Sequence, residues 1–303
     1  MRILSLLLVL VGLGIAGAAF ATILGQAASG TQPWSPELSD NFVFVKAMPF
    51  ALGLGIAVGV LGGLAPRRRA ATRPDGAVKR FSRTSIFLHW LITIGFVLAL
   101  PTGIWQYLGG IIDVHAPVPL YLIYRVHYIG ATIVLFCLAA FLAYSWMTRD
   151  RSLVVPRGQW RAHIRGLMDE LPGSISRRLA GPLRVNMREP APSPGRFTFY
   201  ERVVSFPSWT FVMTLITVTG IVKAARFLIE VPGFVLFVMS TLHVAAMVLI
   251  ILKILDHLRY TIARWPMMVA MTTGWLPPTH RGAPERTVTE RGGSAAALHG
   301  SDT

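Results

Sequence analysis

Two histidines, His243 and His257, stand fourteen residues apart in an almost wholly apolar stretch of the sequence, residues 240–260. Fourteen residues of α-helix rise about 21 Å and return to within about 40° of the starting direction. The two imidazoles therefore share one face of a predicted helix, near its opposite ends. Because ionisable side chains are costly inside a membrane and imidazole is a common metal and haem ligand, we interpret both residues as functional candidates.

Two further histidines lie in other predicted membrane helices. His89, in RTSIFLHWLITIGF, is a few residues into its helix from one side of the bilayer, and His127, in YLIYRVHYIGATIVLF, is a few residues into the next helix from the opposite side. His89 is thus expected level with His257, and His127 level with His243. Two pairs of imidazoles at two depths predict two b-type haems, each bound through two axial histidines from different helices.

Each of these histidines could instead have a structural role, since a lone membrane histidine can hydrogen-bond to a neighbouring helix or lie at the interface. Zinc fits less well, because the two levels are too far apart for a four-histidine site and two imidazoles leave a zinc shell incomplete. The alternatives of another class are a transporter or proton channel and a purely structural membrane anchor. A channel predicts polar residues spread along a path, whereas here the polar positions cluster at two levels.

The composition supports a membrane protein with a non-cysteine redox centre. The 303 residues are 53% hydrophobic and 14% charged, and the only cysteine is Cys137. A single cysteine excludes an intrachain disulfide, a cysteine-held iron–sulfur cluster within this chain and a C-x-x-C-H haem attachment. Six apolar segments are long enough to cross a bilayer: 3–27, 47–64, 85–107, 121–147, 204–224 and 232–258.

These segments predict an all-α, polytopic transmembrane helix bundle. We expect a four-helix dihaem core with one or two additional N-terminal transmembrane helices. The expected organisation is a signal peptide or first transmembrane helix (1–27), an N-terminal extension with one transmembrane helix and a basic cytoplasmic loop (28–84), the core (85–272) and a disordered cytoplasmic tail (273–303).

The distribution of charge predicts the topology. Lys and Arg are concentrated in the loops 65–84 and 148–203 and after residue 258, while the segments 28–46 and 108–120 carry almost none. The positive-inside rule therefore places these basic loops and the C-terminus in the cytoplasm. Lys223 and Arg226, near the opposite side, run against this distribution.

About residues 50–272 resemble the cytochrome b (gamma) subunit of respiratory formate dehydrogenases, within a wider group that includes the cytochromes b of hydrogenases and thiosulfate reductases. The resemblance rests on RFSRTSIFLHW, LALPTGIWQ, YRVHYIGATIVLF, TLITVTGIV and the H-x13-H spacing of LHVAAMVLIILKILDH. It implies haem pairs His89–His257 on the cytoplasmic side and His127–His243 on the other side, in agreement with the depth argument.

The resemblance also implies partners and a location. Electrons would come from an iron–sulfur (beta) subunit associated with a molybdenum or tungsten catalytic (alpha) subunit, and would reach menaquinone or ubiquinone beside the cytoplasmic haem. The location would be the bacterial cytoplasmic (inner) membrane. The alternative is the cytochrome b subunit of a hydrogenase or another molybdo-oxidoreductase. The chain departs from the family where Tyr200, Glu201 and Arg202 replace the Gly, Gln and Lys near the quinone.

Two basic residues are secondary candidates. Arg125, two residues before His127, could bind haem propionates at the outer level or lie at the interface. Lys253, one turn before His257, could bind a propionate or quinone, pair with Asp256, or reach the cytoplasmic interface. No catalytic residue is predicted apart from a possible quinone-reducing site. The remaining histidines are expected on the surface: His115, His163, His280 and His299.

Overall fold

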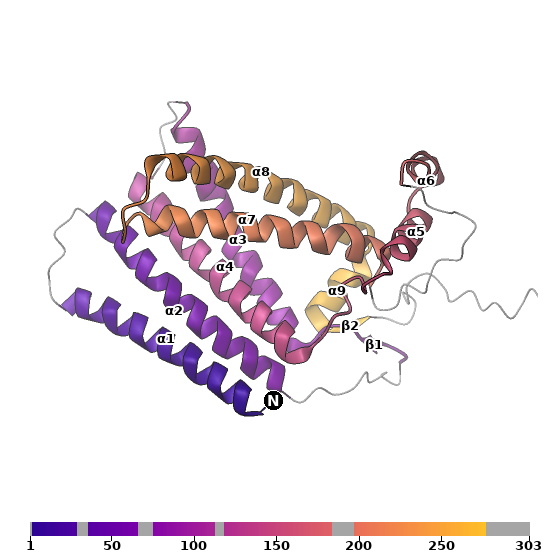
Figure 1. Cartoon of the computed structure of the whole chain (residues 1–303), viewed down its shortest axis with the longest axis horizontal. Coiled ribbons are helices and arrows are strands. Elements are labelled where there is room, and N and C mark those ends of the chain that lie inside the picture. The colour runs from indigo at the N-terminus through magenta and orange to yellow at the C-terminus, as the bar shows by residue number, and fades with distance from the viewer. Residues whose placement is uncertain (1, 29–35, 66–74, 113–117, 184–196, 277–303) are drawn as a thin grey trace, which may run out of the picture.

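The computed structural model describes residues 2–28, 36–65, 75–112, 118–183 and 197–276. Within these ranges, six helices are long and apolar enough to cross a membrane. They are α1 (Arg2–Ala28), α2 (Pro36–Leu64), α3 (Arg83–Gly109), α4 (Leu120–Thr148), α7 (Phe206–Ala225) and α8 (Gly233–Ala263) (Figure 1). The predicted all-α multi-pass membrane bundle is confirmed.

The shorter elements gather at one end of the bundle (Figure 1). They are α5 (Trp160–Glu170), α6 (Gly173–Ala180), a π-helical turn η1 (Glu201–Ser205), α9 (Trp265–Thr273), β1 (Val78–Lys79) and β2 (Trp275–Leu276). Strands β1 and β2 pair antiparallel, with Val78 opposite Leu276. Residues 273–276, expected in the tail, thus form the end of α9 and a strand, while the rest of the predicted tail, 277–303, lies outside the described residues.

Helices are the natural choice here because lipid offers no hydrogen-bond partners to an open backbone. Three of the four core helices begin after a residue that is common at helix N-termini. Ser82 precedes α3 and its hydroxyl accepts a hydrogen bond from the Ser85 backbone N–H at 3.0 Å. Pro119 and Pro232 stand directly before α4 and α8 in extended backbone, so neither interrupts a helical hydrogen bond.

The core consists of two helical hairpins. Helix α3 packs along α4, and α7 packs along α8, whereas α3 and α8 meet only over a short stretch. Within the first hairpin the backbones lie very close, since a Cβ added at Gly130 would be 2.6 Å from the Ala99 nitrogen and 2.7 Å from the Gly95 carbonyl oxygen. The bundle is therefore tight inside each hairpin and more open between the two.

The N-terminal helices form a separate layer on one side of the core. Helix α2 lies along α4, and α1 lies along α2 (Figure 1). Buried side chains of α2, including Phe44, Val45 and Met48, pack against Leu135 of α4. The two alternatives for residues 1–27, cleaved signal peptide or retained helix, stay predictions.

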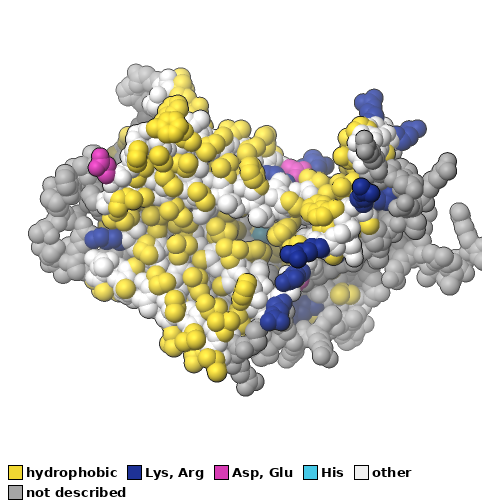
Figure 2. Space-filling view, viewed as in Figure 1, with side chains coloured by type: hydrophobic (Ala, Val, Ile, Leu, Met, Phe, Trp, Pro, Cys, Tyr) yellow, Lys and Arg dark blue, Asp and Glu magenta, His cyan; other side chains and the backbone are white. Residues whose placement is uncertain are grey.

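The surface matches a membrane-embedded bundle. Figure 2 shows apolar side chains over most of the helical surface and Lys and Arg side chains gathered toward the end that carries α5 and α6. Of the described basic side chains, four belong to the opposite end of the bundle: Lys46, Arg125, Lys223 and Arg226. This asymmetry agrees with the sequence distribution, and the assignment of the basic end to the cytoplasm stays a prediction.

The close approach at Gly130 gives a first prediction. Gly130→Ala should lower the free energy of unfolding by about 1–3 kcal/mol, because the added methyl group forces α3 and α4 apart. Gly14→Ala is the matched control, since no atom lies within 4 Å of its added Cβ. Thermal unfolding in detergent, followed by circular dichroism, compares the two variants. Equal melting temperatures for Gly130→Ala and the wild type would contradict this close packing of α3 and α4.

Candidate functional site

His89 of α3 and His257 of α8 face each other at the end of the bundle that carries α9. Their ring centroids are 6.1 Å apart and the ring planes make an angle of 60°. A transition metal binds imidazole nitrogen at about 2 Å, so two imidazoles on opposite sides of one metal ion place their centroids about 6 Å apart. The observed centroid spacing is therefore that of two imidazoles that share one iron.

Aromatic side chains flank this pair, which we call the inner pair. Trp90 lies edge-on to His89 with centroids 5.6 Å apart, and Trp209 of α7 lies edge-on to His257 at 6.2 Å. The Trp90 indole N–H also donates a hydrogen bond of 3.2 Å to the Met271 carbonyl, which ties α3 to α9. Among the described residues, neither imidazole of the inner pair hydrogen-bonds to a protein group.

His127 of α4 and His243 of α8, the outer pair, line a common cavity of about 400 Å³. The cavity lies between the two hairpins, and α2 contributes Phe44 and Met48 to its wall. This volume is within the range of small-molecule and cofactor sites, about 300–1,000 Å³. The structure thus brings the outer histidines to one cavity, as the depth argument expects.

Hydrogen bonds fix the orientation of both outer imidazoles. His127 Nδ1 lies 2.8 Å from the Ala99 carbonyl oxygen, to which it donates. His243 Nδ1 lies 2.9 Å from the Thr219 hydroxyl, whose own proton goes to the Leu215 carbonyl at 2.7 Å. Each ring therefore carries its proton on Nδ1 and keeps the lone pair of Nε2 for a metal, which is the usual arrangement of ligating histidines.

The same dipeptide, Thr-Gly, supports the two outer histidines from two different helices. Thr102 and Gly103 of α3 meet His127, with the hydroxyl 3.3 Å from Nδ1, and Thr219 and Gly220 of α7 meet His243. A Cβ at Gly103 or Gly220 would be 3.1 or 3.3 Å from Cε1 of the facing ring. Both dipeptides occur in strings that carry the family resemblance, LALPTGIWQ and TLITVTGIV, but only the structure shows what they contact.

The secondary candidates occupy different surroundings. Arg125 is exposed, and its guanidinium carbon is 5.7 Å from the centre of the Tyr121 ring. It is not among the residues that line the outer cavity, whereas Lys223 and Arg226 are. Lys253 forms an ion pair of 3.1 Å with Asp256. The propionate and quinone roles of Arg125 and Lys253 stay predictions.

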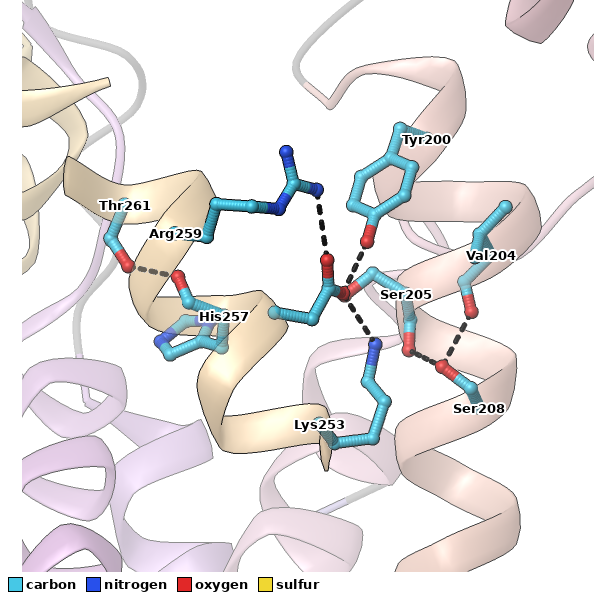
Figure 3. Close-up of polar contacts among 9 residues, drawn as sticks. Tyr200, Val204, Ser205, Ser208, Lys253, His257, Arg259 and Thr261 are labelled. Carbon is cyan, nitrogen blue, oxygen red and sulfur yellow. Dashed lines mark hydrogen bonds and ion pairs between the residues drawn. The ribbon is translucent and has the colours of Figure 1, made fainter. Parts of the chain in front are cut away.

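Asp256 is the centre of a polar cluster beside the inner pair (Figure 3). Its carboxylate accepts hydrogen bonds from the Tyr200 hydroxyl, from Lys253 and from Arg259, the last at 2.9 Å. The His257 imidazole points to the other side of α8 (Figure 3), so Asp256 does not orient this ligand. Burial, together with the hydrogen bond to Asp256, raises the pKa of Tyr200 to about 12, and the phenol stays protonated at physiological pH.

His163 differs from its expected surface position. Its side chain is buried, its Nδ1 lies 2.9 Å from the Gln159 carbonyl, and Arg202 approaches its Nε2 at 3.3 Å. The surface prediction was wrong because the amphipathic helix α5 packs this residue edge-on against Phe199. The other three histidines expected on the surface lie outside the described residues.

The described residues contain no cluster of three or more His, Cys, Asp or Glu side chains that could hold a metal ion. A transmembrane bundle in which histidines of different helices face each other is the architecture of a membrane cytochrome b. The chain belongs to the prokaryotic cytochrome b561 family, whose model matches residues 80–274, more than half of the chain. No curated protein and no solved structure matches it.

Membership of this family implies haem b as the cofactor. The observed geometry fits this group, because the inner imidazoles have the required spacing and the outer imidazoles offer Nε2 to one cavity. The family is that of a membrane electron-transfer cytochrome, and the narrower resemblance to formate dehydrogenase stays a prediction.

The Thr219 hydrogen bond gives a second prediction. Thr219→Val removes the acceptor for His243 Nδ1–H without changing the size of the side chain, and should weaken haem binding at the outer level by about 10- to 100-fold. Thr214→Val on the same helix is the control, since among the described residues that hydroxyl bonds to the Thr210 carbonyl alone. Haem titration of apoprotein in detergent measures the effect. Equal affinities of the Thr219→Val and Thr214→Val variants would argue against the assigned orientation of His243.

Proposed function

We propose that the chain is the dihaem b membrane subunit of a respiratory complex of the formate dehydrogenase type. It carries electrons from an iron–sulfur subunit across the membrane to a quinone. The observation that carries this proposal is the inner pair, whose ring spacing of 6.1 Å fits a single iron, together with the second pair in a cavity at the other level. Haem b supplies one-electron redox chemistry when it is bound.

The chain's own residues hold and separate the two cofactors. His89 and His257 supply nitrogens at one level, and His127 and His243 at the other. Because fourteen residues of α8 separate His243 from His257, the levels are about 21 Å apart along the helix, most of the roughly 30 Å hydrocarbon thickness. This placement supports electron transfer across the bilayer rather than within one leaflet.

The proposed partners are those that the resemblance to formate dehydrogenase implies. Because its one cysteine, Cys137, cannot hold an iron–sulfur cluster, the proposed iron–sulfur (beta) subunit would be another chain, as would the molybdenum or tungsten (alpha) subunit. The proposed acceptor is menaquinone or ubiquinone at the basic, cytoplasmic end of the bundle in the bacterial inner membrane. The polar cluster around Asp256 supports this choice, because it places a protonated phenol, an ammonium and a guanidinium beside the inner pair.

The runner-up is the cytochrome b subunit of a hydrogenase or another molybdo-oxidoreductase, which would use the same two haem levels with a different donor. A transporter or proton channel, or a structural anchor, is less well supported. Neither a channel nor an anchor explains the spacing of the histidines or the Thr-Gly dipeptides that contact His127 and His243.

Haem spectra of single histidine variants test the proposal. The purified wild type should show reduced b-haem bands with two haems per chain. His127→Ala and His243→Ala should each lose the same haem component, and His89→Ala and His257→Ala should each lose the other, because an axial pair fails when either nitrogen is removed. His163→Asn is the control and should keep both haems. A wild type without haem bands would refute the proposal. So would the loss of the same haem component in variants of two histidines that belong to different pairs.

The Asp256 cluster gives a prediction about quinone reduction. Tyr200→Phe should slow electron transfer from the reduced haems to a quinone analogue by roughly tenfold, the effect of losing one hydrogen bond to a charged group. Since the pKa of Tyr200 is raised from 10.0 to about 12, the ratio of wild-type to variant rates should be constant at every pH below about 10.

Tyr260→Phe is the matched control, because Tyr260 stacks on Tyr200 with centroids 5.2 Å apart but bonds to Thr198 and not to Asp256. Stopped-flow absorbance of the haem bands follows both variants. Identical rates for Tyr200→Phe and wild type, with haem content unchanged, would move the quinone site away from this cluster.

A further inference from the structure

Two basic residues in the wall of the outer cavity have no carboxylate partner among the described residues. Lys223 and Arg226 are three residues apart near the end of α7, on one face of the helix, and both line the cavity that contains His127 and His243. Neither lies within ion-pair distance of a described carboxylate, and the cavity wall contains no Asp or Glu. Two like charges at an apolar cavity are unfavourable unless an anion joins them.

Two neutral polar groups in the same wall also lack partners. Gln106 Nε2 and the Thr217 hydroxyl are buried and make no hydrogen bond within the described protein. Such groups are costly when unsatisfied. Both can donate a hydrogen bond, as can the two cations. The cavity therefore presents four donors from α3 and α7, and its ligand should carry several acceptor oxygens and negative charge.

The location of these cations is the third observation. Lys223 and Arg226 lie at the end of the bundle that is otherwise poor in basic residues, so the charge asymmetry that orients a membrane protein does not account for them. Arg125, at the same end, is exposed, contacts Tyr121 and does not line the cavity. Lys223 is half-buried, and Arg226 is exposed and lies 4.8 Å from the Phe227 ring. Both differ from Arg125 in lining the cavity.

We infer that Lys223 and Arg226, with Gln106 and Thr217 as hydrogen-bond donors, bind the propionate carboxylates of the haem held by His127 and His243. This inference rests on the proposed function. A cation beside a propionate offsets negative charge near the iron and favours the reduced, more electron-rich state, so these residues also raise the midpoint potential of the outer haem.

Potentiometric titration of purified variants tests the inference, with the outer haem defined as the component lost in His243→Ala. Lys223→Met should lower the outer midpoint potential and weaken haem retention roughly ten- to hundredfold, the effect of losing a charged hydrogen bond. Lys223→Arg should restore both, and Arg125→Met should leave both unchanged. The exposed Arg226→Met variant, which carries less risk of misfolding, should shift the potential in the same direction.

Reconstitution with haem dimethyl ester isolates the contact, because the ester has no carboxylate to bind. With ester haem, Lys223→Met should no longer weaken haem retention relative to wild type, because the contact that the variant removes needs a carboxylate. Three results would overturn the inference. The first is an unchanged outer potential in both Lys223→Met and Arg226→Met, and the second is a shifted outer potential in Arg125→Met instead. The third is an effect of Lys223→Met on haem retention that is undiminished with ester haem. A wild type that binds both haems but fails these tests leaves the proposed function standing, whereas a wild type without an outer haem overturns the proposed function itself.

Discussion

In the proposed dihaem arrangement, the bond between iron and imidazole nitrogen would set the distance between the helices that carry the histidines. Two such bonds of about 2 Å would hold the rings about 6 Å apart, so the backbones on either side of the metal would have to stand well apart. His89 and His257 have this spacing, at 6.1 Å between ring centroids. In lipid, the hydrophobic effect contributes little to the association of helices. Close packing can therefore be confined to each hairpin, while the two hairpins remain separated. The glycine contacts of α3 with α4, and the cavity between the hairpins, are the two results of this arrangement.

The two histidine levels are built differently. At the outer level, a Thr-Gly dipeptide on the first helix of each hairpin faces the histidine on the second, and both imidazoles donate Nδ1–H to α3 or α7. At the inner level, His89 belongs to α3, the first helix of its hairpin, and His257 to α8, the second helix of its hairpin. The imidazoles there contact the edges of tryptophan rings and make no hydrogen bond to a described residue. Hydrogen bonding to axial ligands is one of the means by which proteins set haem potential, so the two levels have distinct electronic surroundings.

The sequence predicted the six spans and the shared positions of the histidines because both depend on local periodicity. Apolar run length gives the spans, and helical rise and rotation place His243 and His257 on one face of α8. Further features depend on contacts between distant residues. The pairing of Val78 with Leu276, the burial of His163 under α5 and the contact of each Thr-Gly dipeptide with a histidine on the next helix have no signature in one stretch of sequence. Lys223 and Arg226 were visible as exceptions to the charge distribution, but a cavity wall is a property of several helices at once.

The layer formed by α1 and α2 determines how the core can be approached within the bilayer. Helix α2 covers α4, and α1 in turn covers α2, so α4 is screened from the lipid on that side. Bulky side chains such as Phe234 and Phe237 of α8 are left outward-facing, with 77% and 71% of their surface exposed. A neighbouring membrane protein can therefore contact the four core helices directly only over the part of the core's perimeter that α2 leaves uncovered.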